Sequence, residues 1–177
     1  MLCGIDEDGR GTYTADGIKA IAESISVSPA VTECNVRGNC LNAGSAKELA
    51  KIATEKRVTL FGIQHGQTEA DFRMKGLGNA DAILIANDLA VTASMTFVDV
   101  SGNSIGDVGM RTIGAALLRS TTSKLGAIKC DAFDLPVSAT SLDLSGKGIG
   151  SAAGTLLAGV IKGNASVTSV SVMGIGS

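Results

Sequence analysis

The stretch that decides the predicted fold is MTFVDVSGNSI, residues Met95 to Ile105. Its apolar residues stand at the first, fourth, sixth and eleventh positions, and an asparagine stands at the ninth. Residues Val31 to Leu41, VTECNVRGNCL, match this pattern position for position. Looser copies start at Val58, Leu125, Ala139 and Val167, and Cys3-Gly4-Ile5 looks like the inner part of another. The chain therefore contains an internal repeat, and such a repeat is the sequence signature of a repeat architecture.

A second pattern lies between these motifs and indicates helices. Five residues serve as starting points: Tyr13, Leu41, Leu77, Ile105 and Ile149. The residue eight positions after each of them is always a large aliphatic. The ninth is always small: Ala22, Ala50, Ala86, Gly114 and Ala158. An apolar residue four positions after the aliphatic one completes one face of an amphipathic helix. A column of small residues would let neighbouring helix backbones approach closely.

These two patterns predict an α/β fold built from about six strand, turn and helix units. A unit of this size cannot bury its own apolar face, so each would close its core against the next. We expect one domain over residues 1–177, a solenoid with a curved parallel β-sheet on its concave face and α-helices on its convex face. Asn39 and Asn103 stand where the chain leaves a strand, and their amides are expected to bond the exposed backbone there.

Two places depart from the pattern. Residues Glu69 to Gly76 are extra and polar, and they predict a protruding loop. Between Ile128 and Leu142 the step is only 14 residues and contains Pro136, which leaves no room for a helix. Because a parallel connection needs about a dozen residues or more, the pairing of these two strands is left open.

The segments LDLSGKGIG, Leu142 to Gly150, and FVDVSGNSIGDVGMRTIGAAL, Phe97 to Leu117, resemble the ribonuclease-inhibitor-like subfamily of leucine-rich repeat proteins. The chain thereby resembles ribonuclease inhibitor, the Ran GTPase-activating protein, the sensing domains of NLR receptors and tropomodulin ends, which that subfamily includes. The resemblance covers nearly the whole chain. It implies a leucine-rich-repeat solenoid and does not by itself assign a function, because one fold carries many functions.

Side chains that alternate with the inward positions of the strands are expected on the concave face. We predict a partner-binding surface there, made of Glu33, Asn35, Arg37, Leu60, Gln64, Phe97, Asp99, Ser101, Lys129, Asp131 and Asp143. Asp99, Lys129 and Asp143 are expected as neighbours in one row, either as a recognition patch or as a cross-strand salt ladder. Leu2, Leu60 and Phe97 are expected to form an apolar strip, which is either a partner site or covered by the loop that carries Phe72.

Composition excludes several classes of site. The chain has 177 residues, 15 Lys and Arg, 17 Asp and Glu, and a net charge of -2, without basic clusters along the sequence. We therefore expect no nucleic-acid partner, and no uncharged apolar stretch reaches the ~18 residues that membrane insertion needs. His65 is the only imidazole and is expected to be a plain turn residue, so we predict no enzyme, no cofactor and no metal site.

The four cysteines show no CxxC spacing, and Cys3, Cys34 and Cys130 fall on inward positions. All four are expected to be reduced thiols of a cytoplasmic protein, and the three at inward positions are expected to be core residues.

The sequence thus predicts a non-catalytic protein-protein interaction scaffold, a subunit or segment of a larger assembly. The alternative is a GTPase-activating protein of the Ran type, with Arg37 and Arg10 as candidate positions but without the acidic tail typical of those proteins. Both ends of the chain open on apolar strands without polar capping repeats. We therefore expect the chain to be a fragment of a longer one, or its terminal edges to be covered by another chain.

Overall fold

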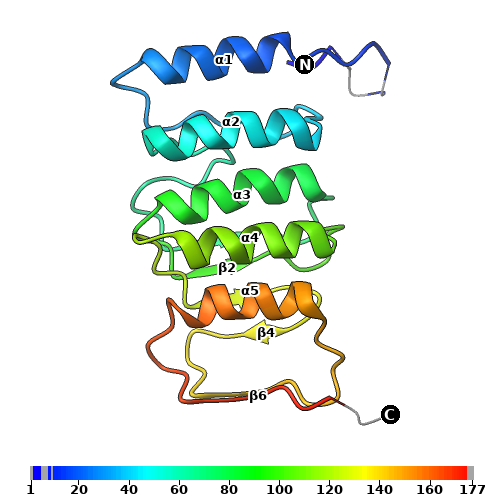
Figure 1. Ribbon diagram of the computed structural model, residues 1–177, viewed down its shortest axis with the longest axis vertical. Helices are drawn as coiled ribbons and strands as arrows, with labels where there is room; N and C mark the ends of the chain where they lie inside the picture. The colour runs from blue at the N-terminus through cyan, green and yellow to red at the C-terminus, as the bar shows by residue number, and fades with distance from the viewer. Residues whose placement is uncertain (1, 5–7, 9, 175–177) are drawn as a thin grey trace.

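The computed structural model of the chain describes residues 2–4, 8 and 10–174. Within them, five helices stand side by side in chain order, each packed against the next (Figure 1). These are α1 (Asp16–Val27), α2 (Ala43–Lys56), α3 (Asn79–Val91), α4 (Asp107–Arg119) and α5 (Ser151–Ile161). The strands lie behind the helices: β1 (Glu69–Asp71), β2 (Phe97–Asp99), β3 (Ala127–Lys129), β4 (Asp134–Leu135), β5 (Ser141–Asp143) and β6 (Ser169–Ser171).

The strands form two separate sheets. One has four strands in the order β1-β2-β3-β4, and the other pairs β5 with β6. In the larger sheet β1, β2 and β3 run parallel, whereas β3 and β4 are antiparallel. The register places Asp71 beside Asp99 and Asp99 beside Lys129, and Lys129 faces Asp134. Charged residues therefore follow one another across all four strands.

The predicted leucine-rich-repeat solenoid is wrong, and so is the classification as a repeat protein. The described residues form short mixed sheets of four and two strands, not one curved parallel sheet of about six repeats. The chain reverses between Lys129 and Asp134, because the short step around Pro136 has no length for a parallel crossover. Toward the N-terminus, the described residues of the first motifs form only one isolated parallel bridge, between Glu33 and Thr59.

The segment predicted as a protruding loop is also different. Glu69–Asp71 is strand β1, and Glu69 pairs with Phe97 of β2. The preceding stretch, predicted as a strand, is instead an irregular segment whose apolar side chains are all buried: Val58, Leu60, Phe61 and Ile63. Four inward side chains within six residues do not fit the two-residue alternation of a strand.

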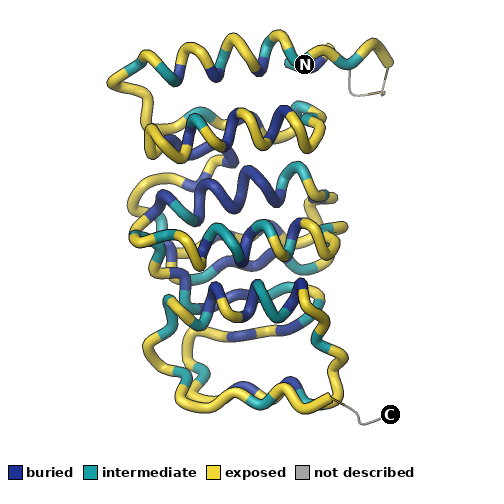
Figure 2. Tube along the Cα trace, viewed as in Figure 1, coloured by how far each residue is buried: buried dark blue, intermediate teal, exposed yellow. Residues whose placement is uncertain are grey.

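Helix α3 lies at the centre of the core. Every residue from Ala82 to Leu89 is buried, which Figure 2 shows as the longest dark segment among the helices. A helix that is apolar all round is typical of such a buried position. α2 and α4 flank α3 on its two sides, so α3 lies in the middle of the row of helices.

The predicted column of small residues is confirmed for the first four helices, where Ala22, Ala50, Ala86 and Gly114 are buried. It is wrong in α5, where Ala158 is exposed; among the described helices α5 packs on α4 alone. The close approach between α4 and α5 is made by Gly114 and Gly159 instead. A Cβ on Gly159 would stand 2.7 Å from the carbonyl oxygen of Gly114.

Polar side chains close several helix ends. Asn42 Oδ1 accepts the backbone N–H of Ser45 at 2.8 Å at the start of α2. At the C-terminal end of α4, the Lys162 ammonium donates to the carbonyls of Leu118 at 2.7 Å and Ser120 at 2.5 Å. A cation at this position satisfies carbonyls that have no partner inside the helix and complements the helix dipole.

The expected role of the two turn asparagines is confirmed. The amide nitrogen of Asn103 donates to the carbonyls of Phe72 at 2.9 Å and Val100 at 2.8 Å. Its oxygen accepts the N–H groups of Lys75 at 2.9 Å and Leu77 at 3.1 Å. Asn103 therefore joins the turn after β2 to the turn after β1.

Asn39 makes a similar bond. Its amide nitrogen donates to the Val36 carbonyl at 3.0 Å.

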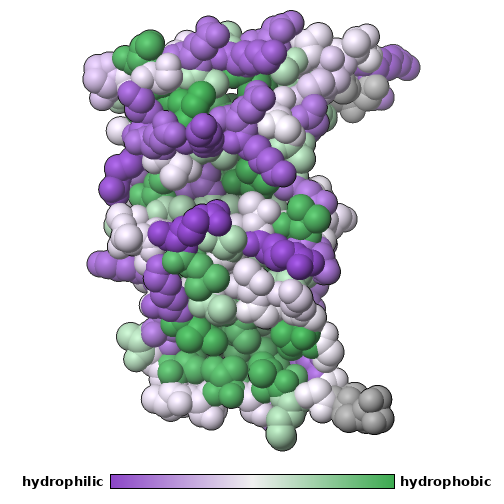
Figure 3. Space-filling model, viewed as in Figure 1, coloured by the Kyte–Doolittle hydropathy of each residue, from purple (hydrophilic) through white to green (hydrophobic). Residues whose placement is uncertain are grey.

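The C-terminal end of the described chain is the more apolar one. Helix α5 carries no charged residue, and Figure 3 shows apolar side chains gathered around it. Beside it, β6 is paired on one side only, and Val170, Val172 and Met173 are exposed. That another chain covers this edge stays a prediction.

The predicted core position is confirmed for Cys3, which is fully buried, whereas Cys34 and Cys130 are half-buried. Cys3, Cys34 and Cys130 are free thiols. None of the described helices is long and apolar enough to cross a membrane.

Candidate functional site

The structure brings together only part of the predicted partner-binding surface. Phe97, Asp99 and Ser101 lie along β2 and its end, and Asp99 is the register partner of Lys129 in β3. Asp143 belongs to the separate pair β5-β6, so the predicted row of Asp99, Lys129 and Asp143 is interrupted by β4. The neighbour of Lys129 on that side is Asp134, whose carboxylate lies 3.7 Å from the lysine ammonium.

On the other side of Asp99, the row continues into residues that the sequence pattern did not identify. The Arg73 guanidinium lies 2.6 Å from Asp71 Oδ2 and 3.6 Å from Asp99 Oδ2. The hydrogen bonds from Arg73 hold the pKa of Asp71 at about 2. Asp99 is buried and Asp71 is exposed, so one arginine pairs with a buried and an exposed carboxylate. The sequence analysis did not identify this cluster because it predicted residues 69–76 as a protruding loop and not as part of the sheet.

Each of these carboxylates also shapes the turn that follows its strand. Asp99 Oδ1 accepts the Ser101 N–H at 2.9 Å, and Asp71 Oδ1 accepts the Arg73 N–H at 3.0 Å. In the second sheet, Asp143 Oδ1 accepts the Ser145 N–H at 2.9 Å, and this bond lowers the pKa of Asp143. One oxygen of each carboxylate is therefore engaged by the backbone, as is usual for turn-forming Asp and Asn.

Arg37 takes part in an aromatic cluster at the N-terminal side of the same face. Its guanidinium lies 5.5 Å from the ring centroid of Phe61 and 5.8 Å from that of Phe72. The two rings meet edge to face with centroids 5.1 Å apart. This geometry gives a cation–π contact and fixes the exposed Arg37 beside the charged row.

The predicted apolar strip is not present on this face. Leu60 is fully buried, and its N–H donates to Asp88 Oδ1 at 2.5 Å. Phe97 is half-buried, and Phe72 is buried against Phe61. The chain at residues 58–63 turns its apolar side chains into the core because Asp88 in α3 binds the backbone there.

Asp88 is the most unusual titratable group of the described chain. It is fully buried, and besides Leu60 it accepts the N–H groups of Phe61 at 2.8 Å and Ile63 at 3.3 Å and the amide of Asn87 at 3.0 Å. Burial raises its pKa to about 6, while the four donors act in the opposite direction. The adjacent polar residues Asn87 and Asp88 inside an apolar helix are the sequence signal that could have identified it.

The remaining predicted residues have local partners. Glu33 Oε1 accepts the N–H of His65 at 3.4 Å, and His65 is the exposed turn residue that was predicted. Asp131 Oδ1 accepts the Gly102 N–H at 2.7 Å, and the Gln64 N–H donates to Gln67 at 3.1 Å.

Asn35 makes the same kind of turn hydrogen bond as Asp71, Asp99 and Asp143, since its Oδ1 accepts the Arg37 N–H at 3.0 Å.

Among the residues that the structure describes, no group of three or more His, Cys, Asp or Glu is arranged to hold a metal ion.

Comparison with known proteins adds little to this picture. No family model matches the chain, and no curated protein matches it. One solved structure that matches is described as "Leiomodin-1 Actin-Binding Site 2 (ABS2)"; it is 16% identical, and the match covers 88% of this chain and 78% of that chain with a TM-score of 0.41. A likeness with this TM-score assigns neither a fold family nor a function. The resemblance to the ribonuclease-inhibitor-like subfamily stays a prediction.

Proposed function

We propose that this chain is a non-catalytic domain that binds another protein through its strand-side surface. The strand-side surface is defined by the charged residues of the row and by Arg37, which contacts the aromatic cluster beside it: Arg37, Asp71, Arg73, Asp99, Lys129 and Asp134. The observation that supports the proposal is that charges of alternating sign from four strands and a separate loop are held in fixed positions.

The geometry suits recognition because the charges are fixed and still accessible. The side chains of Arg73, Asp71, Lys129 and Asp134 are 55%, 56%, 45% and 54% exposed. Exposed ion pairs contribute only about 0–1 kcal/mol, so a partner can exchange them for its own charges at little cost. Alternating signs favour a partner with the complementary order and disfavour others.

A crosslinking experiment tests this proposal. A photo-reactive amino acid at Phe97 in the full chain is expected to crosslink a protein in an extract of the native source, and the partner is then purified. The variant Arg37→Ala/Lys129→Ala should bind that partner at least about tenfold more weakly. The matched control Lys19→Ala/Lys56→Ala, which removes two exposed cations of α1 and α2, should bind it normally.

Two results would overturn the proposal. One is equal binding of the partner by the strand-side variant and the control. The other is the absence of any Phe97 crosslink, with circular dichroism showing that the labelled chain is folded.

A further inference from the structure

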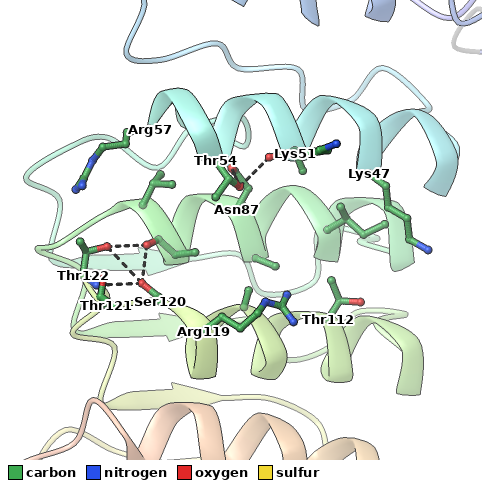
Figure 4. A pocket seen from close by; sticks show the side chains of 16 residues that line it. Lys47, Lys51, Thr54, Arg57, Asn87, Thr112, Arg119, Ser120, Thr121 and Thr122 are labelled. Carbon is green, nitrogen blue, oxygen red and sulfur yellow. Dashed lines mark hydrogen bonds between the residues drawn. The ribbon is translucent and has the colours of Figure 1, made fainter. Parts of the chain in front are cut away.

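The opposite, helix-side face carries a groove that none of the sequence patterns indicated. It runs over α3 between α2 and α4 and encloses about 390 Å³ (Figure 4). We call it the α3 groove. Lys47 and Lys51 of α2 and Arg57 after its end line one side, and Arg119 of α4 lines the other.

The charge in the α3 groove is of one sign. Its lining residues include these four cations and no carboxylate. In the described part of the chain, none of the four makes an ion pair within 4.0 Å. Glu48 and Glu55 of α2 line a second hollow on the side of that helix toward α1, and Lys51 lines both hollows. A chain with net charge -2 thus concentrates unpaired positive charge at one place.

The floor of the α3 groove is apolar and shallow, since Ile83 and Ala86 are only 5% and 3% exposed and Ala90 is half-buried. Ile83, Ala86 and Ala90 of α3 lie along it at helical spacing. Such a floor offers close contact to another apolar surface and has few groups with which to bond a polar ligand.

Three polar side chains of the lining, Asn87, Ser120 and Thr122, already have partners within the protein. Asn87 accepts from the Thr54 hydroxyl at 2.8 Å and donates to the Val58 carbonyl at 2.9 Å. The hydroxyls of Ser120 and Thr122 donate to the Ala90 carbonyl at 2.7 and 2.8 Å. The interactions left for a ligand are therefore ionic contact at the walls and apolar contact at the floor.

We propose that the α3 groove binds an amphipathic helix of a partner protein that carries acidic residues on both sides of an apolar stripe. The floor from Ile83 to Val91 is about 12 Å long and Lys47 and Lys51 are about 6 Å apart along α2, at a rise of 1.5 Å per residue. Carboxylates at four-residue spacing on a docked helix match that separation, and its apolar stripe would pack on α3. This is the helix-in-groove mode of recognition.

Peptide selection tests this proposal without a known partner. A displayed library of random peptides of about 16 residues, long enough to form roughly 24 Å of helix, is selected for binding to the full chain. We expect the recovered peptides to carry Asp or Glu at four-residue spacing around an apolar stripe. They should bind the variant Lys47→Ala/Arg119→Ala at least about tenfold more weakly than the unchanged chain.

Two control variants separate this inference from the proposed function. Lys19→Ala/Lys56→Ala removes as many cations outside the groove, and Arg37→Ala/Lys129→Ala alters only the strand-side surface. Both should bind the peptides normally, so the two proposals can fail independently. Equal binding by the groove variant, retained binding by peptides with a central proline, or recovery of no peptide would each overturn the proposed occupant.

Discussion

At the scale of single residues, the buried carboxylate of Asp88 gives the protein a specific pH dependence. Burial raises its pKa from 3.8 to about 6. A group with a raised pKa in the folded state contributes stability that is fully present below the unfolded pKa and is lost as the pH rises through the folded pKa. We expect the unfolding free energy relative to Asp88→Asn to fall by about 2 kcal/mol between about pH 4 and pH 7.

Urea unfolding of both chains across this range measures that change. Asp71→Asn serves as a comparison whose stability changes with pH in the opposite direction. The pKa of Asp71 is lowered to about 2, so its contribution to the unfolding free energy is lost only as the pH falls below 4. A stability difference between wild type and Asp88→Asn that does not vary from pH 4 to pH 7 would show that the four donors fully offset burial.

Asn103 is the second residue whose contribution can be measured directly. Its amide makes hydrogen bonds to the backbone of Phe72, Val100, Lys75 and Leu77, and these groups belong to two successive turns. Asn103→Ala is expected to lower the unfolding free energy by about 2–4 kcal/mol, since each lost bond costs about 1 kcal/mol. The neighbouring exposed substitution Ser104→Ala should change it by less than about 0.5 kcal/mol. Similar losses for both would contradict this role.

Residue roles were predictable where they depend on neighbours along the chain. Asn103 and His65 were correctly predicted as turn residues, because turn chemistry is local. Arg73 was missed because its near partner Asp71 lies in a segment predicted as a loop and its second partner, Asp99, comes from β2. Asp88 was missed because the backbone groups that it binds lie 25 to 28 residues away. Leu60 was placed on the surface by assuming strand alternation, and its burial follows from the bond to Asp88 that the sequence pattern could not reveal.

At the scale of elements, the contact between α4 and α5 depends on two glycines. A Cβ at Gly114 would stand 2.5 Å from the carbonyl carbon of Thr155 in α5, a contact with backbone that cannot move aside. Gly114→Ala is therefore expected to destabilise the fold by about 1–3 kcal/mol. Thermal or urea unfolding measures the change.

Gly154→Ala is the matched control within α5, because nothing lies within 4 Å of a Cβ built there. It should be neutral or stabilise by up to about 1 kcal/mol, the usual gain of Ala over Gly in a helix. If Gly114→Ala proved as harmless as Gly154→Ala, the helices would have to be free to move apart.

Helix positions were largely predictable and strand pairing was not. The stripe of aliphatic and small residues has the helical period, and all five predicted helices are present. Strand pairing depends on the length of the connections. The strand at Ile128 pairs antiparallel with the unpredicted β4 instead of with the strand at Leu142, which pairs with β6 in the other sheet. Ala158 was misplaced because its exposure depends on whether another helix follows α5.

At the scale of the whole molecule, the α3 groove shows what a linear pattern misses. No basic cluster stands in the sequence, yet Lys47 and Lys51 come together with Arg119, more than 60 residues later. Their proximity arises from helices packed in chain order on both sides of α3. The charge of a surface can therefore differ from the net charge of the chain that forms it.

The same packing order predicts how the molecule opens. Helix α3 is buried along most of its length and flanked on both sides, whereas α1 packs on α2 alone among the helices. Because amide exchange reports local opening wherever it costs less than global unfolding, we expect the amides of Leu84 to Asp88 to exchange most slowly. Those of α1 and β6 should exchange through openings that cost at least about 2 kcal/mol less.

Hydrogen exchange read by mass spectrometry at pH 7 measures this order. Asp88→Asn provides an internal check, because Asp88 joins α3 to the segment at residues 58–63. Its loss should speed exchange at Leu60, Phe61 and Ile63 more than in α1. Uniform protection from α1 to β6 would mean that the molecule unfolds as one unit, in which case packing order does not set local stability.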